Sequence, residues 1–310
     1  MADHTNYVLS CCSTCDLSEK HLRKRDISYI YFNYYLNDVP YKDDFGHSNT
    51  PTEIYNRMLA GEPAKTSQVS VGDYVEHFRS ILREGKDIIH VCLSSGISGT
   101  YNSALDARSY LMREFPDRDI AIVDSLCASA GYGLLMDKLA DLRDEGKPMN
   151  DVLDFIYANR LLVNTRFFVS DLKFLVMGGR VSKASGAIGG LLKICPILQL
   201  DVDGKLSTLE KVRTKKRAIK RIVDIMEEHA QDGAAYNGKC YIAQTECLED
   251  ARAVADEIEA RFPNLAEPVS IYDVGATIGC HLGPGAVVVN FWGDRRLDNA
   301  PRAAGKPKRK

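Results

Sequence analysis

Small and hydroxyl-bearing residues fill the run Ser94-Ser95-Gly96-Ile97-Ser98-Gly99-Thr100, which follows a short apolar segment and precedes an amphipathic one. The pattern predicts a strand-to-helix junction. Free N–H groups at a helix start, aided by the helix dipole and serine hydroxyls, bind a carboxylate or a phosphate. The other interpretation is that Ser98 is only the N-cap of the helix. Thr66-Ser67-Gln68 precedes the helical pattern at 71–84 similarly, with Ser70 as the more natural cap.

The usual catalytic motifs are incomplete in this sequence. Each Gly-Lys pair that begins at residue 85, 146 or 238 lacks the following Ser or Thr of a phosphate-binding loop. Gly131-Tyr132-Gly133 begins like a dinucleotide-binding fingerprint, but it lies inside a helical pattern and lacks the third glycine. Around Ser98, the nucleophile-elbow pattern GxSxG has its second glycine one residue too early. A hydrolase with Ser98 as nucleophile and His281 as base is therefore an alternative.

Composition and charge exclude several classes of protein. The chain has 310 residues, of which 45% are hydrophobic and 26% are charged, so it can bury a large core and is long enough for two domains. Its 40 basic and 42 acidic residues give a net charge of −2, which does not favour nucleic-acid binding. The sequence contains no run of 18 apolar residues, so it predicts no membrane span. The N-terminus also lacks a secretory-signal pattern, and we therefore expect a cytoplasmic protein.

The nine cysteines are an odd number at scattered positions, several of them within apolar runs. This pattern is typical of reduced, buried cysteines rather than of a disulfide framework. Cys12 and Cys15 have CxxC spacing beside Cys11, but no second CxxC pair follows to complete a zinc site. We therefore expect a reduced turn after the first strand and no metal site.

Apolar segments of strand length alternate with amphipathic segments. Strands are predicted at 7–10, 27–32, 87–93 and 120–124, and helices at 71–84, 98–115 and 125–145, which indicates a parallel sheet covered by helices. Later strands are predicted at 165–170, 194–202, 206–211, 240–245, 269–273 and 286–292, with a hairpin turn at Asp203-Gly204 and helices at 213–230 and 248–261. The predicted fold class is α/β, with an N-terminal α/β domain at 6–164, a C-terminal mixed α+β domain at 165–293 and a basic tail at 294–310.

Seven basic residues and no acidic residue occur between Lys211 and Arg221. They are Lys211, Arg213, Lys215, Lys216, Arg217, Lys220 and Arg221. A charge run of this kind is usually a solvated helix face, and its functional interpretation is an electrostatic patch for an anionic partner or a phosphate group. Elsewhere, Gly178-Gly179 predicts a tight turn that follows a helix and presents Arg180.

Seven ordered segments between Ser13 and Gly285 each match a motif of one family. They are Ser13-Thr14-Cys15-Asp16-Leu17 (DSTADL), Thr66-Ser67-Gln68-Val69-Ser70 (TSQPS), 94–104 (SSxxSGTYQSA), 124–131 (DSxxAS-G), 171–180 (DLxYLxxGGR), followed by Pro196-Ile197-Leu198, then 213–218 (RTxKKA) and 279–285 (GxHxGPG). Together they resemble the DegV family of bacterial fatty-acid-binding proteins, the acyl-carrying subunits of fatty acid kinase.

The resemblance implies two α/β domains with a lipid tunnel between them. It implies a protein that binds a long-chain fatty acid, shields the acyl chain and presents the carboxylate for phosphorylation, with no catalysis of its own and no cofactor besides the lipid. The implied fatty-acid-binding residues are Thr66, Ser67, Ser98, Gly99, Thr100 and His281, with Arg180 and Arg213 near the head group on the side of the partner. The implied partners are a separate kinase catalytic subunit, acyl-transfer enzymes of phospholipid synthesis and, transiently, a membrane surface.

The chemistry of these residue types is consistent with the implied role, because hydroxyls and helix N–H groups bind a carboxylate without hydrolysing anything. Three positions depart from the family pattern. Val69 replaces the proline of the second motif, Cys12 stands where the family has its first Asp, and Cys15 stands where alanine is common. The second change removes a carboxylate near the end of the first strand, and it would add redox sensitivity if Cys12 were exposed.

Overall fold

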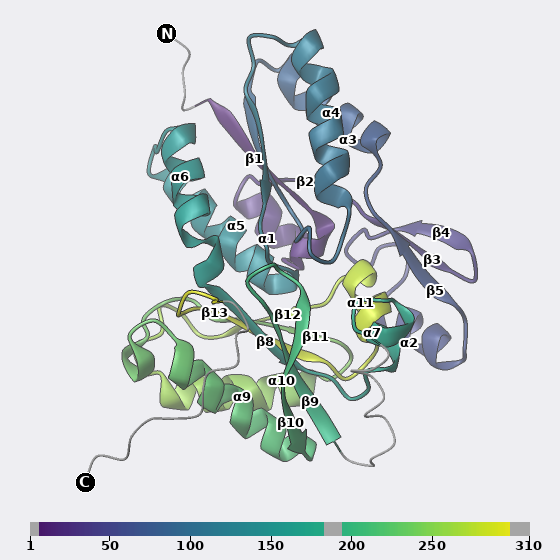
Figure 1. Ribbon diagram of the computed structural model, residues 1–310, viewed down its shortest axis with the longest axis vertical. Coiled ribbons are helices and arrows are strands. Elements are labelled where there is room, and N and C mark those ends of the chain that lie inside the picture. Colours follow the sequence, from purple (N-terminus) through teal and green to yellow (C-terminus); the bar gives the residue numbers. More distant parts are fainter. Residues whose placement is uncertain (1–5, 183–193, 298–310) are drawn as a thin grey trace.

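The structure is a computed structural model that describes residues 6–182 and 194–297. Its first sheet is all-parallel, in the order β2-β1-β6-β7. The strands are β1 (Tyr7–Cys12), β2 (Ser28–Ile30), β6 (Asp87–Cys92) and β7 (Ile120–Asp124). Helices α3 (Val71–Arg83) and α4 (Thr100–Glu114) cover one face, and α1 (Glu19–Lys24), α5 (Ser129–Asp144) and α6 (Met149–Asn159) cover the other (Figure 1). Every residue of β6 is buried, as a central strand between two helical layers requires.

The second sheet is mixed and has the order β10-β9-β8-β13-β11-β12. Its strands are β8 (Val163–Phe168), β9 (Ile194–Leu200), β10 (Leu206–Arg213), β11 (Tyr241–Gln244), β12 (Ser270–Asp273) and β13 (Val287–Trp292). Strands β11 and β12 pair in parallel, and the other neighbours are antiparallel. Helices α9 (Lys215–His229) and α10 (Leu248–Arg261) lie below this sheet in Figure 1, and their apolar faces share a core with it.

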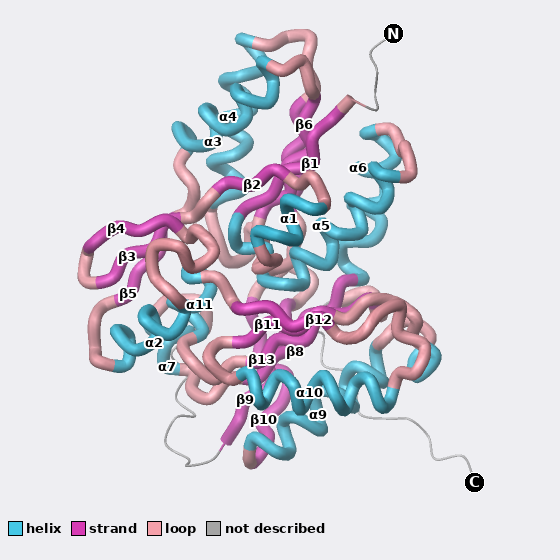
Figure 2. Tube along the Cα trace, turned by 180° about the vertical axis from the view of Figure 1, so that it is seen from behind, coloured by secondary structure: helices cyan, strands magenta, loops and turns pink. Residues whose placement is uncertain are grey.

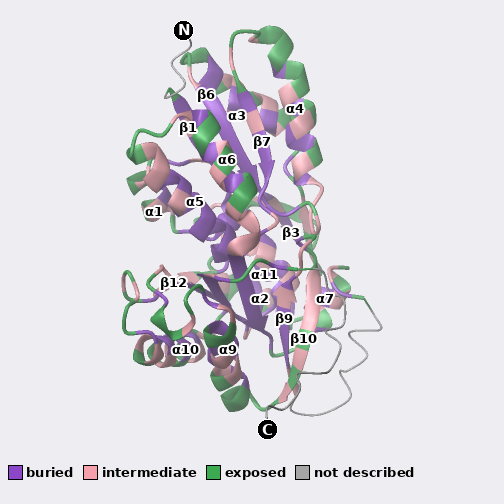
Figure 3. Ribbon diagram, turned by 60° about the vertical axis from the view of Figure 1, so that its left-hand side comes forward, coloured by how far each residue is buried: buried purple, intermediate pink, exposed green. Residues whose placement is uncertain are grey.

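Helix α5 packs between the two sheets and is buried along most of its length (Figure 3). Two of its glycines permit this close approach. A Cβ on Gly131 would lie 2.6 Å from side-chain oxygens of Thr165 and Asn290, and a Cβ on Gly133 would lie 2.7 Å from the backbone oxygen of Cys15. The Gly131-Tyr132-Gly133 motif therefore serves helix packing rather than dinucleotide binding.

A third, antiparallel sheet projects from the first half of the chain, in the order β4-β3-β5. Its strands are β3 (Asn33–Leu36), β4 (Val39–Lys42) and β5 (Ala64–Ser67). Helices α2 (Pro51–Leu59) and α11 (Ala276–Leu282) pack beside it, and α7 (Lys173–Met177) packs against α11 (Figure 2). The sequence patterns did not predict this sheet, because its strands are short and β4 is largely exposed.

The predicted fold class is confirmed: a parallel first sheet is followed by a mixed second sheet. The hairpin at Asp203-Gly204 joins β9 to β10, and Gly204 has a φ of 67°. The division at residue 164 stays a prediction, and the predicted basic tail lies outside the described residues from 298 onward. All nine cysteines are free, and seven of them are buried. Within the described ranges, no helix is long and apolar enough to cross a membrane.

Candidate functional site

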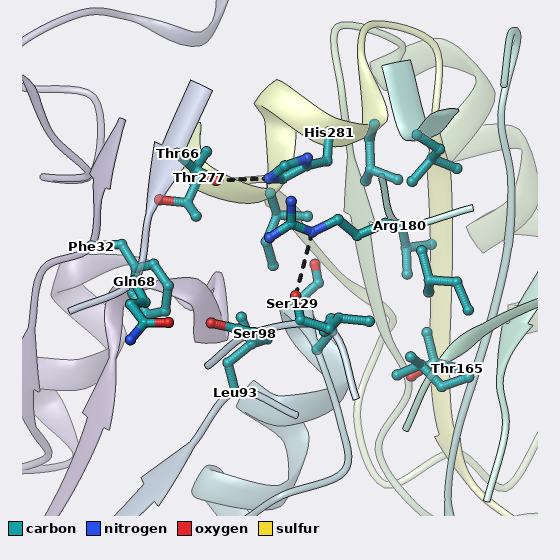
Figure 4. A pocket seen from close by; sticks show the side chains of 18 of the residues that line it. Phe32, Thr66, Gln68, Leu93, Ser98, Ser129, Thr165, Arg180, Thr277 and His281 are labelled. Atoms are coloured by element: carbon teal, nitrogen blue, oxygen red, sulfur yellow. Dashed lines mark hydrogen bonds between the residues drawn. The ribbon is translucent and has the colours of Figure 1, made fainter. Parts of the chain in front are cut away.

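A cavity of about 390 Å³ lies where the second sheet and β5 of the third sheet meet the loop after β6, and we call it cavity 1. This volume is within the range of sites for small molecules. One part of its wall is apolar and consists of Phe32, Leu93, Ile97, Phe167, Leu175, Leu200, Leu206, Ile278, Leu282 and Val288. The polar part consists of Thr66, Ser67, Gln68, Ser98, Ser129, Thr165, Arg180, Thr277 and His281 (Figure 4). No carboxylate is among the described lining residues.

Thr66 and His281 meet at the polar part of cavity 1. The Thr66 hydroxyl and Nε2 of His281 are 2.8 Å apart, and Nδ1 of His281 has no hydrogen-bond partner among the described residues (Figure 4). Thr66 lies in β5, opposite Tyr34 of β3, so the register of the third sheet fixes its position. Burial, together with the nearby charge of Arg180, lowers the pKa of His281 to about 4. The imidazole is therefore neutral near pH 7.

Helix α11, which carries His281, is only seven residues long, so its position depends on contacts from other segments. Asp43 and Asp16 supply these contacts. The Asp43 carboxylate accepts hydrogen bonds from the backbone N–H groups of Ala276 (2.8 Å) and Thr277 (3.3 Å), and Asp16 accepts one from Gly275 (3.0 Å). The sequence analysis gave neither carboxylate this positioning role. Asp16 lies within the first family motif, and no motif includes Asp43.

Arg180 enters cavity 1 from the turn after α7. Its Nε donates to the backbone oxygen of Ile97 (3.3 Å) and Nη1 donates to that of Gly178 (2.6 Å). Neither acceptor carries a full charge, and no described carboxylate forms an ion pair with Arg180. Burial lowers the pKa of this guanidinium, as expected for a cation without a counter-ion. Gly178 allows the His281 ring to lie close to the backbone of this turn, since a Cβ at residue 178 would lie 2.1 Å from Nδ1 of His281.

Ser98 lies in the loop between β6 and α4, and it is not the N-cap of the helix. The N-cap is Gly99, which leaves the Ser98 hydroxyl to accept a hydrogen bond from the N–H of Thr100 at 3.3 Å. Gly99 is in close contact with Gln68, because a Cβ there would lie 2.2 Å from the Gln68 side-chain oxygen. The loop also packs on the β9–β10 hairpin, where Ser94 donates to the backbone oxygen of Gly204 (2.8 Å).

Six of the eight residues that the sequence analysis assigned to the site line cavity 1. They are Thr66, Ser67, Ser98, Gly99, Arg180 and His281. Thr100 does not line the cavity: its side chain is buried, and its hydroxyl lies 2.8 Å from that of Tyr74. Arg213 is exposed at the far end of β10, whose first residue, Leu206, does line the cavity. The structure therefore places neither Thr100, expected to bind the fatty acid, nor Arg213, expected near the head group on the partner's side, at the wall of cavity 1.

Cys12, which replaces the first Asp of the family pattern, is completely buried at the end of β1. Its thiol lies 3.3 Å from the Tyr74 hydroxyl, and burial raises its pKa to about 12. The exposure on which redox sensitivity would depend is thus absent. The Cys12–Cys15 segment forms a reduced turn, as predicted, and no metal-binding cluster of His, Cys, Asp or Glu occurs in the described part of the chain.

A family model described as an uncharacterised protein of the DegV family matches residues 12–293. The chain belongs to the DegV family. A DegV domain-containing protein from Clostridium perfringens is 32% identical over 290 residues, which cover 94% of this chain and 98% of the relative. The structure is also similar to solved structures of fatty-acid-binding proteins.

The solved structure of a fatty-acid-binding DegV family protein from Thermus thermophilus has a TM-score of 0.82 and 27% identity, and covers 93% of this chain and 100% of its own. The fatty acid kinase B3 protein from Streptococcus pneumoniae, loaded with linoleic acid, has a TM-score of 0.81 and 24% identity. It covers 93% of this chain and 100% of its own. Both likenesses support the fold, and the Thermus thermophilus protein binds fatty acid.

Proposed function

We propose that cavity 1 binds a long-chain fatty acid. The carboxylate lies at the polar part, where it accepts hydrogen bonds from Thr66, Ser98 and Arg180, and His281 completes the site. The observation that carries this proposal is the charge of the wall: an arginine without a carboxylate partner faces a cavity whose described lining contains no acid. A carboxylate is the complementary group, and charge-assisted hydrogen bonds to arginine are among the strongest.

The acyl chain occupies the apolar part of the wall, to which the second sheet, α7, α11 and the loop after β6 contribute. Each buried methylene contributes about 0.8 kcal/mol, so some fifteen methylenes supply roughly 12 kcal/mol before ordering costs. The apolar wall therefore provides most of the affinity, and the polar residues fix the orientation. This division supports long-chain acids over short ones.

The proposed role is that of a carrier rather than an enzyme. The bound acid is presented to a separate kinase subunit, whose phosphoryl donor transfers phosphate to the carboxylate, and the chain then holds an acyl phosphate. Arg180 is suited to the added negative charge, because its guanidinium forms bidentate contacts with phosphate oxygens. The free thiols fit a reducing, cytoplasmic compartment. The proposal of a kinase partner is supported by the family motifs, including the exposed Arg213 in the basic run.

The hydrolase alternative lacks its central hydrogen bond. A serine nucleophile requires a base within hydrogen-bond reach, and the base requires a group that orients it. Nε2 of His281 instead contacts Thr66, and Nδ1 has no described carboxylate beside it. Ser98 accepts from a backbone N–H at the start of α4. This geometry supports a ligand-binding serine.

Organic extraction of the purified protein, followed by mass spectrometry, tests the proposal. We expect one long-chain fatty acid per chain, and a protein that neither carries nor takes up such an acid would contradict it. The double variant Thr66→Ala/Ser98→Ala should weaken oleate binding by at least about tenfold, because two hydrogen bonds to a charged group are lost. Ser109→Ala, an exposed serine of α4, is the matched control. Ester hydrolysis that Ser98→Ala abolishes would favour the enzyme instead.

A further inference from the structure

A second cavity, of about 410 Å³, lies on the opposite side of the start of α11 from cavity 1, and we call it cavity 2. Its wall comes from the segment after β1, the loop between β4 and α2 with the start of α2, and the segment from β12 to α11 (Figure 2). Gly275 and Ala276 line cavity 2, while Thr277 and Ile278 line cavity 1. The start of α11 is thus a partition between two cavities of similar volume.

The charge of cavity 2 is opposite to that of cavity 1. Four carboxylates line it, those of Asp16, Glu19, Asp43 and Asp273, and its described lining contains no lysine or arginine. Glu19 forms an ion pair with Arg23 (2.6 Å) and contacts Nε2 of His47 (3.0 Å). Asp16, Asp43 and Asp273 form no ion pair with any described residue. These three carboxyl groups therefore have no cationic side chain as a partner within the described residues.

Two of these carboxylates are deeply buried and close together. Asp16 is 4% exposed and Asp43 is 2% exposed. A Cβ on Gly275 would lie 2.9 Å from Oδ1 of Asp16 and 3.1 Å from Oδ1 of Asp43, so both groups reach the same point of the wall. Burial raises the pKa of each, and proximity to Asp43 raises that of Asp16 further. Like charges in such a place are unfavourable unless a cation accompanies them.

The hydrogen bonds that these carboxylates already accept leave capacity for a ligand. Asp16 accepts from Gly275 and from the Ser129 hydroxyl, which is two of the about four bonds that an ionised carboxylate can accept. Asp273 accepts one described bond, from Gln244, and its side chain is otherwise exposed. A cation could thus be added without breaking the contacts that hold α11.

An independent feature also indicates a ligand. Tyr55 of α2 lines cavity 2 and is 3% exposed. Its hydroxyl lies against α11, where a Cβ on Gly279 would be 2.4 Å from it, and it forms no hydrogen bond within the described residues. A ligand N–H donor in the cavity would supply a partner. Phe45 and Tyr272 also line the cavity, so three aromatic rings accompany the carboxylates. Aromatic faces attract organic cations.

We propose that cavity 2 is a second binding site, for a small organic ammonium ligand held by the Asp16, Asp43 and Asp273 carboxylates and by the rings of Phe45, Tyr55 and Tyr272. A bare metal ion is a poorer match, since no group of three metal-ligating side chains converges within the described residues. This site is separate from the fatty-acid site, and its existence does not depend on the function proposed for cavity 1.

Isothermal titration of the delipidated full chain tests this proposal with matched probes. The cations are choline and butylammonium, and their neutral analogues are 3,3-dimethylbutan-1-ol and butan-1-ol. We expect at least one cation to bind once per chain with a dissociation constant below about 1 mM, and at least about tenfold more tightly than its analogue. Equal binding of cation and analogue, or no binding, would overturn the proposal, as would binding of Mg²⁺ or Ca²⁺ but neither ammonium.

Variants locate the binding. Asp273→Asn removes an exposed charge without disturbing α11, and it should weaken ammonium binding by about fivefold. Tyr55→Phe removes only the unpartnered hydroxyl and should weaken butylammonium, which donates N–H groups, more than choline. Asp256→Asn, an exposed carboxylate of α10, is the charge-matched control and should leave binding unchanged. If Asp273→Asn and Tyr55→Phe both bind like the control, the ligand lies elsewhere and the proposal is wrong.

Discussion

Cavity 1 and cavity 2 have similar volumes, about 390 and 410 Å³, and share the start of α11 as a wall, but their charges are opposite. Cavity 1 has an arginine and hydroxyls but no described carboxylate, whereas cavity 2 has four carboxylates and no described lysine or arginine. The two cavities therefore differ in the charge of their walls rather than in the space available, and the ligands proposed for them differ accordingly. The two carboxylates that hold α11 from cavity 2 also position His281 in cavity 1.

Reversing the charge of cavity 1 is the largest change we consider. Arg180→Glu places a carboxylate where the fatty acid carboxylate is proposed to lie, and it should reduce oleate affinity by at least about 100-fold, measured by fluorescence titration. Arg180→Lys keeps the charge but loses the planar fork, so its loss should be smaller, about tenfold. Arg217→Glu, in the exposed basic run, is the control for net charge. Oleate affinity of Arg180→Glu equal to that of the control would refute the assignment.

The wall of cavity 1 also depends on space at one glycine. Gly178→Ala would place a Cβ 2.1 Å from Nδ1 of His281, so the ring must move away from Thr66. We expect unfolding by urea to become easier by about 2 kcal/mol, with weaker oleate binding. Gly72→Ala in α3 is the matched control, because its Cβ would meet only the Ser70 hydroxyl oxygen at 3.8 Å, an ordinary contact. A Gly178→Ala protein as stable as Gly72→Ala would mean that His281 is not confined.

Titratable groups at the two cavities should change the stability of the folded chain with pH in opposite directions. The pKa of His281 is about 4 in the folded chain and about 6.5 when unfolded, so its contribution to stability is complete above pH 6.5 and is lost as the pH falls towards 4. The raised pKa values of Asp16 and Asp43 act in the opposite sense, since their contribution is lost as the pH rises.

The contribution of His281 can be isolated by comparing the wild type with His281→Gln in urea unfolding at pH 7 and pH 5. Between these pH values the wild type should lose about 2 kcal/mol more than the variant, because a neutral imidazole must gain a proton on unfolding. An identical loss in both proteins would show that His281 is not held in its neutral form.

The smallest effect that we expect concerns the shared wall. Asp43→Asn preserves shape but replaces one acceptor of the α11 N–H groups with a donor, so α11 should shift slightly. We expect oleate affinity to fall by about fivefold, roughly 1 kcal/mol, with a changed imidazole ¹⁵N shift for His281. Asp73→Asn, at the start of α3, changes a helix-start carboxylate remote from both cavities and should have neither effect. If the two variants had the same oleate affinity and the same His281 ¹⁵N shift, Asp43 would not position α11.

The sequence predicted much of cavity 1 because its residues fall in recognisable motifs. Thr100 does not line cavity 1, because it is the first residue of α4 and its side chain is buried beside Tyr74. The sequence does not define where α4 begins. Arg213 is exposed, as a partner-facing residue must be, but it ends an eight-residue strand of which the first residue, Leu206, lines the cavity. A sequence motif does not show which end of its strand lies at the cavity.

Cavity 2 could not be predicted from the sequence, because its carboxylates are far apart along the chain. Asp16 follows β1, Asp43 follows β4 and Asp273 ends β12, and only the folded third sheet and α11 bring them together. The third sheet was itself missed: Val39 and Pro40 in β4 are exposed and give no alternating apolar pattern. A burial signal was therefore lacking for the very segment that supplies Asp43.

A crystal structure of the chain with palmitate tests the central claim most directly. We expect the carboxylate oxygens within hydrogen-bond distance of the Thr66 and Ser98 hydroxyls and of Arg180, with the acyl chain along Leu206 and Val288 in cavity 1. Palmitate bound in cavity 2 or on the surface, with cavity 1 free of lipid, would contradict the assignment of the fatty-acid site.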